Sequence, residues 1–170
     1  MLVLILGSSG MIGSTMARVV SETKGYEVHG IGRRSIIERS LDLHLTYHQC
    51  DDLTHESSLA FWLNELNPDI IINCLGLTKH YKEGGEPLHA IRANALFPHM
   101  LAKLARGFNA RVIHVSTDCV FDGKKGSYQE LDFKTETNYY GLTKNLGEVI
   151  NDKNLTIRTS IIGPELKLKS

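Results

Sequence analysis

The sequence of 170 residues has no net charge and no long apolar segment. Lys plus Arg and Asp plus Glu both number 19, so no overall field favours nucleic acid or an anionic membrane as a partner. The opening residues MLVLILG are apolar but too few to span a bilayer, and they lack the basic flank of a signal peptide. We therefore expect one domain, located in the cytoplasm, that binds neither nucleic acid nor membrane.

Cysteine is scarce, and its three copies argue against both a disulfide framework and a metal centre. Cys50, Cys74 and Cys119 are odd in number, widely spaced and each set in an apolar run, as expected for reduced core thiols. Among eight histidines, His44 and His48 stand four residues apart, but no carboxylate or thiolate completes a ligand set. We expect no bound metal.

Short β-branched runs alternate along the chain with longer stretches of helical spacing. The expected strands are residues 2–6, 26–31, 45–50, 69–74, 111–115 and 155–159. The expected helices are residues 11–23, one beginning near 54, 87–106 and 138–151. Apolar strands joined by crossover helices predict an α/β fold with a doubly wound parallel sheet of the Rossmann type. Residues 1–160 would form an NADP-binding domain, and residues 161–170 would begin a substrate-binding region that is largely absent.

A glycine-rich loop, G-S-S-G-M-I-G, joins the first predicted strand to the first helix. Its glycines permit a tight turn and close approach of the backbone to a pyrophosphate, which would lie at the positive end of the following helix. The spacing is one residue longer than G-x-G-x-x-G, but the strand–loop–helix context still predicts a dinucleotide site. The loop residues expected to contact the cofactor are Gly7, Ser9, Gly10, Met11, Ile12 and Gly13.

The second predicted strand ends in Gly32, Arg33 and Arg34, where an NAD-binding domain would carry an acidic residue. A guanidinium can pair with a 2′-phosphate, so we expect NADPH as the cofactor, with NADH as the alternative. The third strand ends at Asp51 and Asp52, one of which would either meet the adenine edge or cap the next helix. Further cofactor contacts are expected at Asp52, Leu53, Leu75 and Gly76.

Hydroxyl-bearing residues end the fifth predicted strand, and a tyrosine and a lysine follow on the next helix. Ligands bind beyond the carboxyl ends of the strands in such sheets, which places Ser116 and Thr117 near a bound nicotinamide. Tyr140 and Lys144 lie one helical turn apart, on the same side. Lowering the pKa of a phenol from about 10 to about 7 takes roughly 4 kcal/mol, and we expect the ammonium to supply much of it. Tyr140 would then act as a general acid.

Three motifs together resemble the extended short-chain dehydrogenase/reductase superfamily: the glycine loop, S-T-D at 116–118 and Y-G-L-T-K-N-L-G-E at 140–148. Within it, the chain resembles the dTDP-4-dehydrorhamnose reductases and related reductases of nucleotide-linked keto-sugars. The resemblance implies a catalytic triad of Thr117, Tyr140 and Lys144, with Thr117 orienting the carbonyl and Ser116 as the alternative. Tyr140 and Lys144 would also contact the cofactor. The implied activity is NADPH-dependent reduction of a nucleotide-linked 4-keto-6-deoxy sugar, in the synthesis of sugars for cell-surface polysaccharides.

Departures from the family pattern leave other functions open. Cys119 stands where tyrosine is common after S-T-D, and Thr137-Asn138 stands where proline is usual, so the identity of the sugar is open. The resembling reductases are much longer and add a C-terminal region that grips the nucleotide-sugar. The alternatives are a nucleotide-binding subunit without turnover and an epimerase that uses the same triad. An uncovered apolar flank would favour self-association, which allows a homodimer.

Two further segments carry candidate residues. Asn94, in R-A-N-A, either supports the backbone of the active site or is a plain polar helix residue. The stretch from Lys79 to Lys82 is a charged loop that either touches a substrate phosphate or is simply solvated.

Overall fold

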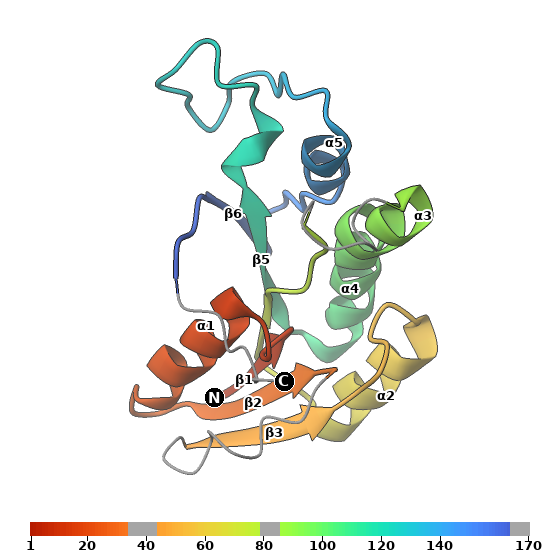
Figure 1. Ribbon diagram of the computed structural model, residues 1–170. Helices are drawn as coiled ribbons and strands as arrows, with labels where there is room; N and C mark the ends of the chain where they lie inside the picture. The colour runs from red at the N-terminus through yellow and green to blue at the C-terminus, as the bar shows by residue number, and fades with distance from the viewer. Residues whose placement is uncertain (34–43, 79–85, 164–170) are drawn as a thin grey trace, which may run out of the picture.

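A six-stranded parallel sheet forms the centre of the computed structural model, which describes residues 1–33, 44–78 and 86–163 (Figure 1). The strands are β1 Leu2–Leu6, β2 Glu27–Gly32, β3 Leu45–Gln49, β4 Ile70–Asn73, β5 Arg111–Thr117 and β6 Leu155–Thr159. Their order, β3-β2-β1-β4-β5-β6, reverses its direction of winding between β1 and β4, where dinucleotide-binding folds hold their ligand. The predicted doubly wound α/β fold is confirmed.

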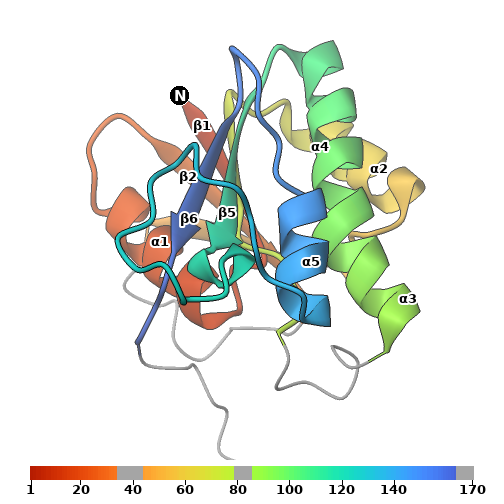
Figure 2. The same ribbon diagram turned by 90° about the horizontal axis from the view of Figure 1, so that it is seen from above.

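Helices cover both faces of the sheet. They are α1 Met11–Ser21, α2 Glu56–Leu66, α3 Pro87–Ala90, η2 Ile91–Leu96, α4 Phe97–Ala105, η3 Arg106–Phe108, η4 Asp118–Val120 and α5 Tyr139–Leu146. Figure 2 shows α1 on one side of the sheet and α2, α4 and α5 on the other. Side chains alternate along a strand, so Leu4 and Leu6 pack toward α2 and α4, whereas Val3 and Ile5 pack toward α1.

The long helix predicted for residues 87–106 exists but contains a π-helical turn, η2. Pro98 follows this turn and has no N–H to donate to the carbonyl of Asn94. Gly147 packs instead against that carbonyl, since a Cβ built on Gly147 would collide with the Asn94 oxygen. Single π-turns are frequent at functional sites, and this one turns Asn94 fully inward.

The helix predicted for residues 138–151 is shorter than expected, because α5 ends at Leu146. The N–H of Gly147 donates to the carbonyls of Thr143 and Lys144 at 3.2 Å each, which closes the last turn. The chain then leaves the helix, and the N–H of Val149 donates to the Thr156 hydroxyl at 3.1 Å. This early exit brings Glu148 over β5 and β6.

The edge strand β6 keeps part of its apolar surface open. Leu155 and Ile157 remain 42% and 43% exposed. Such an exposed apolar strand is consistent with the uncovered flank expected from the sequence. Among the described residues, no helix is long and apolar enough to cross a membrane.

Candidate active site

The glycine loop makes a tight connection between β1 and α1. Gly7 has a positive φ of +79°, and the N–H groups of Gly7 and Ser8 both donate to the Ile31 carbonyl, at 2.8 and 3.1 Å. A Cβ on Gly13 would collide with the Gly7 carbonyl, so α1 can start here only with glycine. A Cβ on Gly7 would lie 3.0 Å from the Leu75 nitrogen, so the loop also touches the end of β4.

A pocket of about 410 Å³ opens beyond the carboxyl ends of β1 to β4. Its lining consists of Gly7, Ser9, Gly10, Gly32, Arg33, Cys50, Asp51, Asp52, Leu53, Thr54, Cys74, Leu75, Gly76, Leu77, His89, Arg92 and Ala93. The volume is that of a small-molecule site, and the glycine-lined wall with Arg33 and Arg92 beside it suits a phosphate-bearing ligand.

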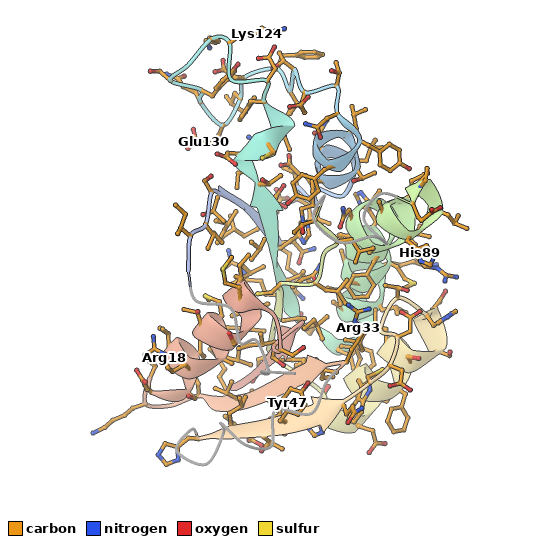
Figure 3. All side chains as sticks on the ribbon, viewed as in Figure 1. Arg18, Arg33, Tyr47, His89, Lys124 and Glu130 are labelled. Carbon is orange, nitrogen blue, oxygen red and sulfur yellow. The ribbon has the colours of Figure 1, made fainter. Side chains whose placement is uncertain are left out.

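The pocket brings together most of the predicted cofactor residues. Those that line it are Gly7, Ser9, Gly10, Arg33, Asp52, Leu53, Leu75 and Gly76. Met11, Ile12 and Gly13 are not in the lining, because they form the first turn of α1. Arg34 lies outside the described residues. Figure 3 shows Arg33 at the end of β2, on the same side of the molecule as His89.

Several lining residues were not predicted as cofactor contacts, and His89, Arg92 and Ala93 are among them. These three come from α3 and η2, about sixty residues after the arginines of β2. The stretch R-A-N-A could have pointed to them only through the family resemblance, because an arginine on a helix has no local signal for a pocket.

Asp52 lines the pocket and fixes the turn before α2, but it does not cap that helix, whose N-cap is His55. Its Oδ1 accepts from the Thr54 N–H at 2.8 Å and from the Thr54 hydroxyl at 2.6 Å, which fixes the turn before α2. Burial raises the pKa of this carboxyl, but the hydrogen bonds from Thr54 and the charges of His55 and Arg92 bring it below its usual value. Asp52 is therefore an anion at neutral pH on the wall of the pocket.

Two buried amides hold the segment that follows β4. The Asn73 Oδ1 accepts from the Leu75 N–H at 3.1 Å. Asn94 binds both polar groups of Leu77: its Oδ1 accepts from the N–H at 2.8 Å, and its Nδ2 donates to the carbonyl at 2.9 Å. The same Nδ2 also donates to the Thr143 hydroxyl on α5 at 3.2 Å. Of the two roles considered for Asn94, support of the backbone is confirmed.

Thr117 and Tyr140 meet beyond the end of β5. Their side chains share a hydrogen bond, which lowers the pKa of Tyr140. The larger influence is burial, which raises that pKa, and Cys119 and Asp118 raise it further, so the net pKa lies above 10.0. A Cβ on Gly141 would collide with the Cys119 carbonyl, so the glycine allows the close approach of α5 and η4 that pairs these hydroxyls.

Lys144 is buried, with 4% of its surface exposed, and its Nζ donates to the Val115 carbonyl at 2.8 Å. It lies beside the pocket, because its Nζ is 3.7 Å from the position of a Cβ on Gly76. The expectation that this ammonium lowers the pKa of Tyr140 is wrong for this arrangement. Burial dominates the phenol, and the ammonium is directed at the backbone of β5.

The alternative hydroxyl, Ser116, is already engaged with the segment that follows α5. It donates to the Glu148 Oε1 at 3.0 Å, whereas Thr117 is the hydroxyl that acts on Tyr140. The geometry thus favours Thr117 as the hydroxyl that faces a substrate carbonyl.

Of the remaining polar candidates, His44 and His48 do not line the pocket. His48 contacts His29, with 2.9 Å between its Nε2 and the His29 Nδ1, under α2. The stretch from Lys79 to Lys82 falls outside the described residues. In the described ranges, no three His, Cys, Asp or Glu side chains come close enough to hold a metal ion.

Comparison with known proteins identifies relatives of this chain. Residues 1–163 match the family described as the RmlD substrate binding domain. The dTDP-4-dehydrorhamnose reductase of Mycolicibacterium smegmatis is 34% identical over 148 residues, covering 86% of this chain and 40% of the relative.

Solved structures agree with this match. A hypothetical dTDP-4-dehydrorhamnose reductase from Sulfolobus tokodaii superposes with a TM-score of 0.80 at 34% identity, over 93% of this chain and 55% of that one. The dTDP-4-dehydrorhamnose reductase of Bacillus anthracis, solved in complex with NADP, gives 0.74 at 25% identity, over 92% and 52%.

The chain thus spans about half the length of the relatives it matches. The predicted resemblance to the extended short-chain dehydrogenases and their dTDP-4-dehydrorhamnose reductase branch is confirmed. A family match over residues 1–163, together with the fold, means that this chain belongs to the RmlD substrate binding domain family.

Proposed function

We propose that this chain is the NADPH-binding and proton-donating part of a reductase that acts on a nucleotide-linked 4-keto-6-deoxy sugar. The observation that carries the proposal is the placement of Lys144, with the Thr117–Tyr140 pair beyond the same end of β5. The Lys144 Nζ is 3.7 Å from the position of a Cβ on Gly76, and Gly76 lines the pocket behind the glycine loop. The buried lysine thus connects the glycine-lined pocket to the end of β5, beyond which Tyr140 lies.

The cradle fits the phosphate-bearing half of NADPH. Gly7 and Gly10 leave their backbone accessible, and the start of α1 behind them suits an anion. Arg33, exposed at the rim, would pair with the 2′-phosphate that distinguishes NADPH from NADH. Gly76 would let the cofactor ribose approach the wall formed by β4.

Tyr140 would protonate the oxygen of the sugar ketone. Its raised pKa means that Oη holds its proton throughout the neutral range. NADPH, when bound, supplies the hydride that reduces the ketone. Thr117, bonded to Tyr140, would orient the carbonyl oxygen toward the phenol. Lys144, whose Nζ lies 3.7 Å from the position of a Cβ on Gly76, would place a positive charge beside the cofactor ribose.

The three cysteines are unpaired in the structure, which supports the proposed location in the cytoplasm, where a reductase would find NADPH. A nucleotide-sugar would be the principal partner. A second copy of the chain is a further proposed partner, and it would cover the exposed apolar side of β6.

The test is NADPH oxidation by the purified chain with a dTDP-4-keto-6-deoxyhexose. Replacing Tyr140 by Phe should lower the rate roughly 100- to 10,000-fold, the usual contribution of a positioned general acid. Tyr139→Phe is the matched control, because the Tyr139 hydroxyl donates to the Pro87 carbonyl at 2.8 Å. This variant should keep near wild-type turnover.

Other outcomes discriminate the alternatives. NADPH binding without oxidation of any keto-sugar would contradict the reductase and support a nucleotide-binding subunit. A change in sugar configuration without net loss of NADPH would support an epimerase. Equal rates for Tyr140→Phe and wild type would remove Tyr140 as the acid.

A further inference from the structure

A buried charge network lies behind Lys144, beyond the predicted triad. The Glu148 side chain is only 3% exposed and accepts three hydrogen bonds. Arg158 Nε donates to Oε1 at 2.6 Å, and its Nη2 donates to Oε2 at 2.7 Å. The Ser116 hydroxyl donates to Oε1 at 3.0 Å. This two-pronged arrangement is the one by which a guanidinium fixes a carboxylate.

The sheet register builds this network. Ser116 on β5 and Arg158 on β6 are paired residues, so both side chains project from the same face. Glu148 reaches them because α5 ends at Leu146 and the chain turns over the strands. Arg158 also donates to the Glu130 carbonyl at 2.9 Å and stacks 5.5 Å from the centre of the Phe121 ring. The carboxylate is therefore held rigidly.

Glu148 and Lys144 are anchored on adjacent residues of one strand. The Lys144 ammonium donates to the Val115 carbonyl, and Glu148 accepts from Ser116. We propose that Glu148 is a positioning residue: its clamped carboxylate is the fixed negative charge that keeps Lys144 an ammonium at the end of β5. The inference rests on the proposed function, which gives Lys144 its role.

The neighbours of Lys144 single out Glu148. Among the described residues, the ionisable side chains whose charges act with that of Lys144 are Cys74, which follows β4, His114 on β5 and Glu148, which follows α5. Tyr140 lies one turn earlier on α5. Burial raises the pKa of the Cys74 thiol to about 12 and lowers the pKa of His114 to about 3, so both are uncharged at neutral pH. Tyr140 is also neutral there. Glu148 is the anion that remains.

Lys144 needs such a partner. Burial lowers its pKa to about 8, even though the charges of Glu148 and Cys74 raise it. Without Glu148 the same burial would carry the pKa toward or below neutrality, and much of the lysine would be an uncharged amine. An uncharged amine would bring no positive charge to the cofactor ribose beside Gly76.

The test measures the pKa of Lys144 directly, by NMR titration of the protein with isotope-labelled lysine. The Lys144 resonance is assigned by its loss in Lys144→Arg. Glu148→Gln should lower the pKa of Lys144 by about one unit or more, the usual effect of removing a close opposite charge. Arg158→Gln should raise it, because it removes the guanidinium that offsets the carboxylate.

Opposite shifts in the two variants distinguish this role from a structural one. If Glu148 only anchors β6, losing either partner should leave the pKa unchanged or move it in the same direction, and either result would overturn the proposal. If a single variant fails to fold, Glu148→Gln/Arg158→Gln removes both charges and should still lower the pKa. An unchanged pKa in that double variant would also refute the proposal.

The readout separates this inference from the proposed function. The titration needs neither cofactor nor substrate, so it can succeed in a chain that shows no turnover. Where turnover is present, Glu148→Gln should shift the alkaline fall in NADPH oxidation to lower pH. Tyr139→Phe, which changes no contact of the Glu148–Arg158 pair, should keep the wild-type profile within about half a unit.

Discussion

Acid should destabilise this protein through one buried histidine. His114 on β5 is fully buried, and its Nδ1 lies 3.0 Å from the Asn73 Nδ2. The Nε2 has no partner among the described residues. Burial, with smaller contributions from the positive charges of Lys144 and His99, lowers the pKa of His114 to about 3.

The sign follows from the protons bound in each state. In the unfolded chain His114 has a pKa near 6.5 and binds a proton at a pH where the folded chain does not. The free energy of unfolding therefore falls as the pH drops below about 7. At pH 5 the difference spans about 1.5 units, or about 2 kcal/mol at ~1.4 kcal/mol per unit. The loss continues until the pH reaches about 3.

Urea unfolding at pH 7.5 and pH 5 measures this effect. Wild type should lose about 2 kcal/mol more than His114→Gln, whose amide oxygen can still accept from Asn73 but cannot titrate. His48, whose pKa is also lowered by burial and by His29, adds equally to both proteins and cancels. The exposed His89 is the control: His89→Gln should keep the wild-type slope. An equal loss in wild type and His114→Gln would refute the reasoning.

Three other substitutions test the site. Arg33→Ala should weaken NADPH binding roughly 10- to 150-fold, from the loss of a charged hydrogen bond, and leave NADH nearly unchanged in calorimetric titration; equal losses would remove the 2′-phosphate argument. Asn94→Ala leaves the part-buried N–H and carbonyl of Leu77 without their amide partner and should cost about 1–3 kcal/mol in urea unfolding; a loss below about 0.5 would show that the amide is dispensable. Gly147→Ala forces a methyl against the Asn94 carbonyl and should cost about 1–3 kcal/mol, whereas Gly107→Ala, with open space around it, should be mild; equal costs would contradict the packing.

The cofactor side of the molecule could be predicted from the sequence because its signals are local. Gly7 and Gly10 predict a tight turn through their backbone freedom, and the apolar run before them predicts β1. Arg33 follows its strand directly, and the sheet then carries it to the pocket. Thr117 and Tyr140 were also anticipated, since each ends or starts a recognisable element.

What escaped prediction depends on contacts between distant segments. The insertion of η2 depends on Gly147 packing against Asn94, about fifty residues away. The direction of the Lys144 side chain depends on a carbonyl of β5, which has no sequence signal. The pairing of Glu148 with Arg158 depends on the strand register. The raised pKa of Tyr140 reflects its partial burial in the folded chain, which no spacing rule supplies.

The segment that follows β4, residues 73–77, affects how tightly a nucleotide can bind in the pocket. Because Asn73 and Asn94 already occupy the peptide groups of Leu75 and Leu77, this stretch was ordered when the chain folded. Fixing the backbone of one residue costs about 1–2 kcal/mol of conformational entropy. If these five residues were disordered, ordering them would therefore reduce the binding free energy of a ligand by several kcal/mol. A ligand binds to a segment that is already ordered, so its affinity is not reduced by the cost of ordering that segment.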